Sequence, residues 1–207
     1  MDSLGGHDDQ LMPENKVAER ERPTTDALTG LPTLRGAEQS IVRELSRAKR
    51  HKTPFCCILL DIDRFIDVNL GYGYVIGDRI LCEIGALLRR NTRGYDISIR
   101  LGNDDFLVIL PDADGQQAQR VATRIVHSIE TLTVEGIPPI TATAGVAAST
   151  LCERTDDWGS EEDLIKLRRE ADKRLYQAKA AKGPRIVSRG YSTSVGGDNV
   201  PIGDDPR

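Results

Sequence analysis

The chain has 207 residues, of which 39% are hydrophobic and 29% charged, and its formal net charge at pH 7 is -4. This length and balance predict about one soluble globular domain whose core needs no metal or disulfide. The small negative charge gives no reason to expect nucleic acid or an anionic membrane as a partner, and no apolar run approaches the roughly 18–20 residues of a membrane span.

Both ends of the chain are polar and lack periodicity. The first ten residues, MDSLGGHDDQ, have neither the basic region nor the apolar core of a secretory signal, so we expect a cytoplasmic protein. Residues 1–23 predict a flexible N-terminal segment, and the Gly-, Ser- and Asp-rich residues 189–207 predict a disordered C-terminal tail. The folded domain is then expected over residues 24–188.

Helical and strand-like patterns alternate along the first half of this domain. Apolar side chains recur on one face of the residues that follow Pro32, which predicts an amphipathic helix running to about Arg50. The unbroken apolar run of residues 55–60 predicts a central strand that is buried on both faces. A short helical stretch, a glycine-rich loop at 71–74 and an amphipathic helix beginning at Asp78 follow.

The second half begins with a predicted β-hairpin. Residues 97–101 alternate apolar and polar side chains, residues 105–110 are almost all apolar, and Gly102-Asn103-Asp104 between them suits a tight turn. A helix opening at Asp112, a strand over 140–147, a helix beginning at Ser160 and a short strand over 184–187 complete the pattern. These elements predict an α/β (α+β) fold: about five mostly antiparallel strands with helices packed on them.

Carboxylates stand at two strand ends. Asp61 and Asp63 close the buried run, and Asp104 and Asp105 form the hairpin tip. If the sheet pairs these strands, both groups reach one edge, where carboxylate oxygens and the Ile62 carbonyl would suit Mg²⁺ and phosphoryl transfer. The alternative is that all four acids are ordinary solvated strand ends and turns.

Several segments, in this order and spacing, resemble one known family. They are DALTGLP (26–32), LLDIDRF (59–65), RGYDISIRLGNDDF (93–106) and ADKRLYQAK (171–179). Together they resemble the GGDEF domain of diguanylate cyclases. The resemblance implies a palm-polymerase-like or nucleotidyl-cyclase-like fold that joins two GTP molecules into cyclic di-GMP. It also implies a homodimer in which each subunit presents one GTP.

The resemblance implies a role for each matching residue. The expected ligands of Mg²⁺ or Mn²⁺ are Asp61, the carbonyl of Ile62, and Asp104. The expected catalytic acids are Asp104 and Asp105, and the expected GTP contacts are Asn69, Asp78 and Lys179. Arg93 and Asp96 match the family's Arg-x-x-Asp inhibitory site, where product binds. A structural salt bridge is the alternative for that pair.

The sequence departs from the family at positions that contact substrate. Asn103 replaces the second glycine of the signature and Asp105 replaces its glutamate, which is one methylene longer. Ile66 stands where a phosphate-binding lysine is usual, Leu70 where an aspartate is usual, and Tyr74 where a histidine is usual. Each lost charge-assisted contact typically costs about 1.5–3 kcal/mol, so two losses would weaken GTP binding by about two to four orders of magnitude.

We therefore predict a cyclic di-GMP signalling protein whose cyclase site is degenerate, with weak or no activity. It would bind GTP or cyclic di-GMP as a receptor or regulator, or act as a partner for other proteins. One alternative is a working diguanylate cyclase that uses the altered signature. A second alternative is a dimerisation module that binds no nucleotide.

Overall fold

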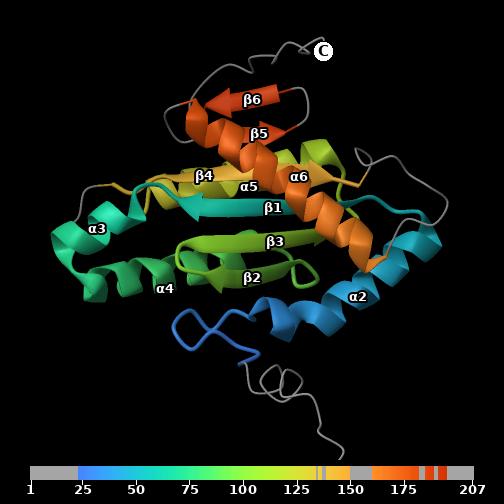
Figure 1. Ribbon diagram of the computed structural model, residues 1–207, viewed down its shortest axis with the longest axis horizontal. Helices are drawn as coiled ribbons and strands as arrows, with labels where there is room; N and C mark the ends of the chain where they lie inside the picture. Colours follow the sequence, from blue (N-terminus) through green and yellow to red (C-terminus); the bar gives the residue numbers. More distant parts are fainter. Residues whose placement is uncertain are drawn as a thin grey trace, which may run out of the picture.

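A central β-sheet organises the molecule (Figure 1). The structure is a computed structural model that describes residues 23–133, 135–136, 139–149, 160–181, 185–188 and 191–194. Within these residues the sheet has six strands in the order β2-β3-β1-β4-β5-β6. They are β1 (Phe55–Ile62), β2 (Ile97–Gly102), β3 (Asp105–Pro111), β4 (Ala142–Ala148), β5 (Arg185–Ser188) and β6 (Tyr191–Ser194).

Strand β1 lies at the centre and pairs antiparallel with both β3 and β4. Strand β2 pairs antiparallel with β3, and β4 with β5 is the one parallel pair among the named strands. The predicted α+β fold with a mostly antiparallel sheet is therefore confirmed, with one strand more than the expected five. None of the helices in the described part of the chain is long and apolar enough to cross a membrane.

Helices cover both faces of the sheet (Figure 1). Two of them, α2 (Leu34–His51) and α6 (Glu161–Ala180), pack on one face, and α4 (Tyr74–Asn91) and α5 (Gly115–Glu130) pack on the other. The short helix α3 (Phe65–Tyr72) follows the end of β1 and packs against α4. The face covered by each helix decides which side chains of the strands are buried beneath it.

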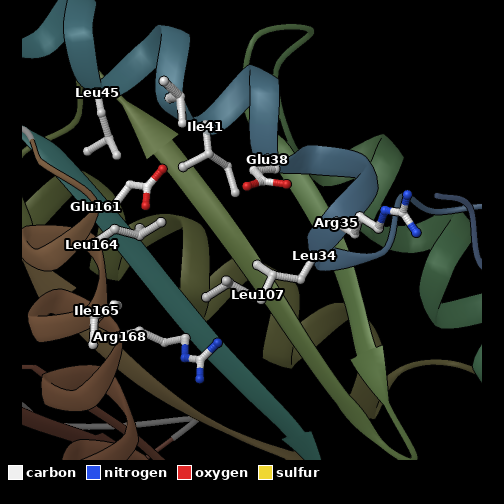
Figure 2. A pocket seen from close by; sticks show the side chains of 11 residues that line it. Leu34, Arg35, Glu38, Ile41, Leu45, Leu107, Glu161, Leu164, Ile165 and Arg168 are labelled. Carbon is white, nitrogen blue, oxygen red and sulfur yellow. The ribbon is translucent and has the colours of Figure 1, made fainter. Parts of the chain in front are cut away.

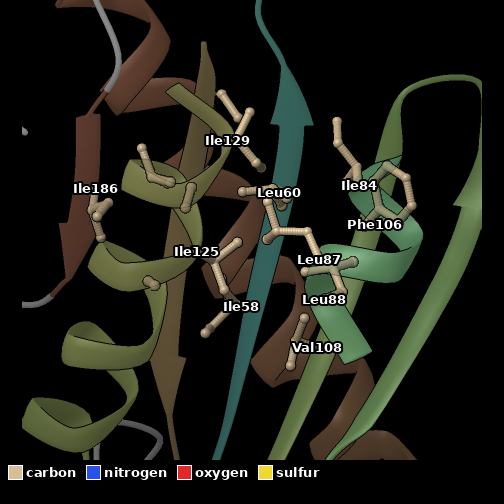
Figure 3. Packing of buried hydrophobic residues seen from close by; sticks show 14 of the residues in the cluster. Ile58, Leu60, Ile84, Leu87, Leu88, Phe106, Val108, Ile125, Ile129 and Ile186 are labelled. Atoms are coloured by element: carbon tan, nitrogen blue, oxygen red, sulfur yellow. The ribbon is translucent and has the colours of Figure 1, made fainter. Parts of the chain in front are cut away.

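The alternation of side chains in β1 supplies both layers of the core. Cys57 and Leu59 point toward α2 and α6, whereas Ile58 and Leu60 point toward α4 and α5. Figure 3 shows the second layer, where Ile58 and Leu60 meet apolar side chains of α4, α5, β3 and β5. This confirms that the apolar run forms a central strand buried on both faces.

Two predicted helix boundaries are wrong. The glycine-rich residues 71–74 form no loop, because α3 continues to Tyr72 and α4 begins at Tyr74 rather than at Asp78. Gly73 alone separates the two helices, with a φ of 85° that favours glycine. Helix α5 begins at Gly115 rather than at Asp112, since the side chain of Asp114 accepts a hydrogen bond from the backbone N–H of Gln117 and caps it.

The C-terminal part of the domain also differs from expectation. Strand β6 lies within residues 189–207, for which a disordered tail was predicted, and it pairs with β5 over Tyr191–Ser194. The prediction of disorder is therefore wrong for these four residues. The rest of that segment, and residues 1–22, lie outside the described residues.

Candidate active site

The register of the sheet brings the predicted carboxylates together. Asp61 on β1 is the Cα partner of Asp105 on β3. Asn103 and Asp104 form the turn between β2 and β3, and Asn103 adopts a φ of 45°, which asparagine tolerates better than most residues. The end of β1 and the hairpin tip therefore share one edge of the sheet. We call Asp61, Asp104 and Asp105 the carboxylate edge.

Burial and mutual repulsion raise the proton affinity of this edge. The side chain of Asp61 is only 15% exposed, and this burial raises its pKa from 3.8 to about 6, although an ion pair with Lys179 opposes the shift. Asp104 and Asp105 raise the pKa of Asp61 further. Burial and the neighbouring Asp104 also raise the pKa of Asp105. The charges of Asp61 and Asp105 are thus incompletely neutralised by protein groups.

Lys179 reaches the carboxylate edge from α6, on the same face of the sheet. The side chains of Asp61 and Asp105 follow those of Leu59 and Leu107, which point toward α2 and α6. The ammonium of Lys179 forms an ion pair with Oδ1 of Asp61. The predicted triphosphate contact therefore stands beside the predicted metal ligands, 118 residues away from Asp61 in the chain.

Asp63 has a different role from Asp61. The hydroxyls of Thr141 and Thr143 both donate to its carboxylate at 2.7 Å, and its backbone N–H donates to the Thr141 carbonyl at 2.9 Å. These bonds tie the end of β1 to the start of β4. Of the two acids that close the apolar run, the structure places Asp61 in the carboxylate edge and uses Asp63 to hold the strands.

The carboxylate edge fits a divalent cation by its donor set. Carboxylate and carbonyl oxygens are the ligands that Mg²⁺ and Mn²⁺ prefer, and a cation would relieve the repulsion that raises the pKa of Asp61 and Asp105. No group of three or more His, Cys, Asp or Glu side chains in the described residues is arranged to hold a metal ion by itself. A cation here would therefore need the Ile62 carbonyl, water or substrate oxygens to complete its shell.

The predicted guanine contacts lie on the helix pair α3–α4. Asn69 lies on α3 and its Oδ1 is buried without a hydrogen-bond partner, which is unusual for a polar atom. A Cβ added at Gly77 would lie 1.9 Å from this oxygen, so glycine at 77 leaves the room that Asn69 occupies. Asp78 is the next residue on α4 and is exposed. The structure thus places Asn69 close to the turn of α4 that carries Asp78.

The outer surface of the same helix pair is apolar. Ile66, Leu70 and Tyr74, the positions at which the resemblance leads us to expect polar residues, are exposed by 71%, 77% and 73%. An exposed aliphatic side chain cannot donate a hydrogen bond to a phosphate or a guanine edge. Ile66 and Leu70 therefore offer a ligand no hydrogen bond at this surface, whereas the exposed hydroxyl of Tyr74 can still donate or accept one.

Arg93 and Asp96 lie in the turn between α4 and β2. The carboxylate of Asp96 accepts a hydrogen bond from the backbone N–H of Arg93 at 2.7 Å. The Arg93 guanidinium donates to the Tyr95 hydroxyl at 2.7 Å and lies 5.7 Å from the centre of that ring. The contact between Arg93 and Asp96 in these described residues thus runs through the Arg93 backbone, and the Arg93 charge also attracts the Asp96 carboxylate. Burial raises the pKa of Asp96, and the bond from Arg93 opposes the shift.

A groove of about 320 Å³ adjoins this turn. Arg93 and Asp96 line it together with Arg89, Pro32 and Ser98. Its guanidinium groups and carboxylate are groups that can pair with a phosphate or a guanine edge. The groove lies at the start of β2 and the carboxylate edge follows its end, so the two sites are separate.

Sequence patterns did not indicate Arg100 as a site residue. The alternation in β2 predicted an outward polar side chain, but Arg100 is 6% exposed, and its guanidinium lies 4.4 Å from the centre of the Phe106 ring. Its charge acts on Asp26, Asp104 and Asp105, and it lowers the pKa of Asp105. An arginine in the strand just before an acidic turn is the signal that could have identified it.

Comparisons with known proteins agree with this geometry. The family model described as "Diguanylate cyclase, GGDEF domain" matches residues 23–185. The chain belongs to the GGDEF family. It is 32% identical over 172 residues to the response regulator PleD of Caulobacter vibrioides, a match that covers 82% of this chain and 37% of PleD. It is 34% identical over 161 residues to the diguanylate cyclase DgcZ of Escherichia coli, covering 76% of this chain and 51% of DgcZ. The chain thus spans about half or less of these GGDEF proteins.

Solved structures show the same GGDEF fold. The diguanylate cyclase SiaD of Pseudomonas aeruginosa, in complex with its activator SiaC, superposes with a TM-score of 0.70 at 32% identity. That match covers 86% of this chain and 66% of SiaD. The GGDEF domain of DgcB from Caulobacter crescentus, in complex with c-di-GMP, has a TM-score of 0.68 at 23% identity and shows the fold alone. It covers 80% of this chain and 93% of that domain.

Proposed function

We propose that this GGDEF domain serves cyclic di-GMP signalling as a receptor or regulator, and that its cyclase site is degenerate, with weak or no turnover. The observation that carries the proposal is a contrast within one site. The carboxylate edge brings Asp61 and Asp105 together, whereas the α3–α4 surface beside it presents Ile66 and Leu70 to solvent.

The carboxylate edge would hold the cation. Asp61, Asp104 and the Ile62 carbonyl would be its protein ligands, and Mg²⁺ or Mn²⁺ would neutralise charge on the phosphate oxygens of GTP. Asp104 and Asp105 would then orient the 3′-hydroxyl and accept its proton. The raised pKa of Asp105 makes its carboxylate a better proton acceptor than an ordinary aspartate.

The triphosphate and the guanine would be held less firmly. Lys179 is available beside Asp61, and Asn69 and Asp78 would meet the guanine edge. Ile66 offers phosphate oxygens no cationic partner, and Leu70 offers the guanine no carboxylate acceptor. Losing these contacts weakens GTP binding and leaves the reacting groups poorly positioned, which lowers the rate as well.

The Arg93–Asp96 groove would bind cyclic di-GMP. The Arg93 guanidinium can exchange the Tyr95 hydroxyl for a phosphate or a guanine edge, and the Tyr95 ring beside it offers a face for stacking. Asp96 is already held by the backbone of Arg93, so the turn is shaped before a ligand arrives. Binding at this groove requires no contribution from the degenerate site.

A working cyclase remains the competing function, because the carboxylate edge and the Asn103 turn survive. Purified protein incubated with GTP and Mg²⁺ is expected to form little or no cyclic di-GMP, measured by chromatography. Robust formation that disappears in Asp104→Ala would replace the receptor proposal with that of an active enzyme acting as a homodimer.

Calorimetry with cyclic di-GMP tests the receptor role directly. Binding is expected for the unchanged protein and is expected to weaken by about tenfold or more in Arg93→Ala, the loss typical of one charge-assisted contact. Arg90→Ala is the matched control, since Arg90 is also exposed but does not line the groove. Absence of binding by the unchanged protein would leave a module that binds no nucleotide at this groove.

A further inference from the structure

Most of the exposed large apolar side chains in the described residues lie in two places. One group stands at the end of the sheet where β1 finishes, on the left in Figure 1, and we call it the α3–α4 patch: Ile66, Leu70, Tyr72, Tyr74 and Val75. These five border the predicted guanine contacts and so belong to the site already described. The other group is Leu34, Val42 and Ile165, which are 38–51% exposed and line one groove between α2 and α6 (Figure 2).

This second surface, the α2–α6 groove, is a concave and largely aliphatic site. Its volume of about 540 Å³ lies within the range of small-molecule sites. Its walls are the facing sides of the two helices, and Leu107 of β3 lies on its floor (Figure 2). Seven of the 11 lining residues are aliphatic and none is aromatic, so the groove suits an aliphatic ligand. The seven are Leu34, Ile41, Val42, Leu45, Leu107, Leu164 and Ile165.

The charged residues of the groove are separated along its length. Figure 2 shows Glu161 beside Leu45 at one end, with Arg35 and Arg168 toward the other. On α6, Arg168 follows Glu161 by seven residues, which is about 10 Å along the helix. On α2, Glu38 lies between Arg35 and Leu45. An anionic group is therefore favoured at the arginine end of the groove and disfavoured at the end near Glu161.

Arg168 is available to an anion. It makes no hydrogen bond or ion pair with any other residue that the structure describes, and its guanidinium extends from α6 over the strands (Figure 2). The neighbouring Arg174, in contrast, pairs with Glu170 at 2.8 Å. A guanidinium can bind a carboxylate through two parallel hydrogen bonds. The groove thus joins an aliphatic channel to a cationic group at one end.

The width of the groove limits what can enter it. Leu34 and Leu45 are eleven residues apart on α2, so the groove runs for about 16 Å. Spread over that length, 540 Å³ gives a mean cross-section of about 33 Å². A helix with its side chains is about 10 Å or more across, roughly 80 Å² in section, and is too wide to enter. A single extended chain fits.

An extended peptide would be poorly matched to this groove. Its N–H and C=O groups need hydrogen-bond partners. The backbone of β3 is already paired with β1 on one side and β2 on the other, and the walls are helices. An alkyl chain carries no polar group along its length. A chain of twelve carbons spans about 13 Å, at about 1.2 Å for each bond, and so fits within the length of the groove.

We propose that the α2–α6 groove binds a medium-chain fatty acid, with its alkyl chain between the two helices and its carboxylate on Arg168. The groove shares no lining residue with the Arg93–Asp96 groove and none with the carboxylate edge, so the inference does not rest on cyclic di-GMP binding. One wall is α6, the helix that also carries Lys179. The ligand would therefore lie on the element that positions this lysine beside Asp61.

Calorimetry of the full chain with decanoate and dodecanoate, below their micelle-forming concentrations, tests the proposal. One molecule is expected to bind per chain. Dodecanoate is expected to bind about fourfold more tightly than decanoate, the gain from two methylenes that are about half buried. Ile165→Asp and Val42→Asp, one on each wall, are each expected to weaken binding by about tenfold or more, because a charge would lie against the alkyl chain.

Val75→Asp is the matched control for these two variants. It places the same charge at an exposed apolar position on α4, outside the groove, and is expected to leave binding unchanged. Circular dichroism confirms folding, since all three positions are exposed.

A second pair of variants tests the carboxylate contact. Arg168→Gln is expected to weaken binding of decanoate by about tenfold, the loss typical of one charge-assisted contact. It is expected to leave binding of decanol unchanged, because decanol has the same chain without the charge. Arg169→Gln is the control, since Arg169 is exposed and does not line the groove, and it is expected to change neither.

Each of the other outcomes overturns the proposal. Absence of binding, equal affinity for the two acids, or equal losses in Ile165→Asp and Val75→Asp would show that the groove takes no alkyl chain. Equal effects of Arg168→Gln on decanoate and decanol would remove the carboxylate from Arg168. Binding only above the micelle-forming concentration, or only to vesicles of anionic lipid, would identify a general attraction to assembled amphiphiles instead.

Discussion

The carboxylate edge and the α3–α4 patch lie at the same end of the sheet, yet the fold holds their residues in different ways. Strand pairing sets Asp61 opposite Asp105, and α6 brings Lys179 to them. Ile66 and Leu70 lie on the open side of a short helix and touch little. Strand pairing and α6 therefore fix the residues of the carboxylate edge, whereas Ile66 and Leu70 are held only by a lightly packed helix.

The largest effect on stability is expected where α6 packs on β4. A Cβ at Gly145 of β4 would lie 2.0 Å from the Ala171 carbonyl oxygen of α6. Gly145→Ala must therefore displace the helix that carries Lys179, and we expect a loss of about 3 kcal/mol in the free energy of unfolding. Chemical denaturation measures it.

Gly71→Ala is the matched substitution in the other region. A Cβ there meets nothing within 4 Å, and the residue lies within α3, so alanine is expected to stabilise the protein by about 0.5–1 kcal/mol. Equal changes in the free energy of unfolding for Gly145→Ala and Gly71→Ala would show instead that α3 is packed as tightly as the contact between β4 and α6.

The next largest effect on stability is expected at Asp61, and it depends on pH. Its carboxyl binds a proton more tightly in the folded chain, where its pKa is about 6, than at its ordinary value of 3.8. Stability is therefore lost as pH rises from about 4 to about 6, and a cost of about 2–3 kcal/mol remains above that range. In EDTA at about pH 7, Asp61→Asn is expected to raise the free energy of unfolding by about 2 kcal/mol and to flatten its pH dependence.

Asp63→Asn is the control for that substitution. The Asp63 carboxylate accepts hydrogen bonds from Thr141 and Thr143, so an amide in its place loses an acceptor and is expected to destabilise the protein by about 1–2 kcal/mol. Loss of stability in both variants would contradict the assignment of unrelieved charge to Asp61.

The contrast between these two aspartates also shows what sequence patterns can reveal. The apolar run of β1 identified a strand buried on both faces and the acids at its end. It did not distinguish Asp61 from Asp63, because their partners come from β3, β4 and α6. These contacts join residues 44 to 118 positions apart and depend on the pairing of strands and helices, which local periodicity does not encode. The family resemblance supplied that pairing.

Local patterns were wrong where tertiary packing overrides them. Ser98 and Arg100 alternate with apolar residues and so predicted an exposed face of β2, yet both are buried. Helix α4 covers that face, and the Arg100 guanidinium lies over the Phe106 ring, although its Nη1 is buried without a hydrogen-bond partner. Composition also suggested a loop at residues 71–74, although the positive φ of Gly73 is enough to separate the two helices.

A smaller loss of stability, which also depends on pH, is expected on substitution of Lys179. Lys179→Met removes the cation from Asp61 and is expected to cost about 1 kcal/mol, because the Lys179 side chain is 41% exposed and solvent screens the pair. The loss should appear above about pH 6, where Asp61 is ionised, and vanish below about pH 5, where it is protonated. Denaturation at several pH values measures it; a loss of the same size at low pH would indicate packing of the lysine stem instead.

The smallest change in stability is expected at Ile66, and it separates the two regions most clearly. Ile66 is 71% exposed, so Ile66→Lys should alter the free energy of unfolding by no more than about 0.5 kcal/mol. One restored charge-assisted contact, worth about 1.5 kcal/mol, should nevertheless strengthen binding of GTP with Mg²⁺ by about tenfold, measured by calorimetry. Val75→Lys adds the same charge to the same patch and should not strengthen it. If both lysines strengthen GTP binding equally, general electrostatic attraction explains the gain. If only Ile66→Lys strengthens it, α3 still holds the side chain at position 66 where a triphosphate would lie.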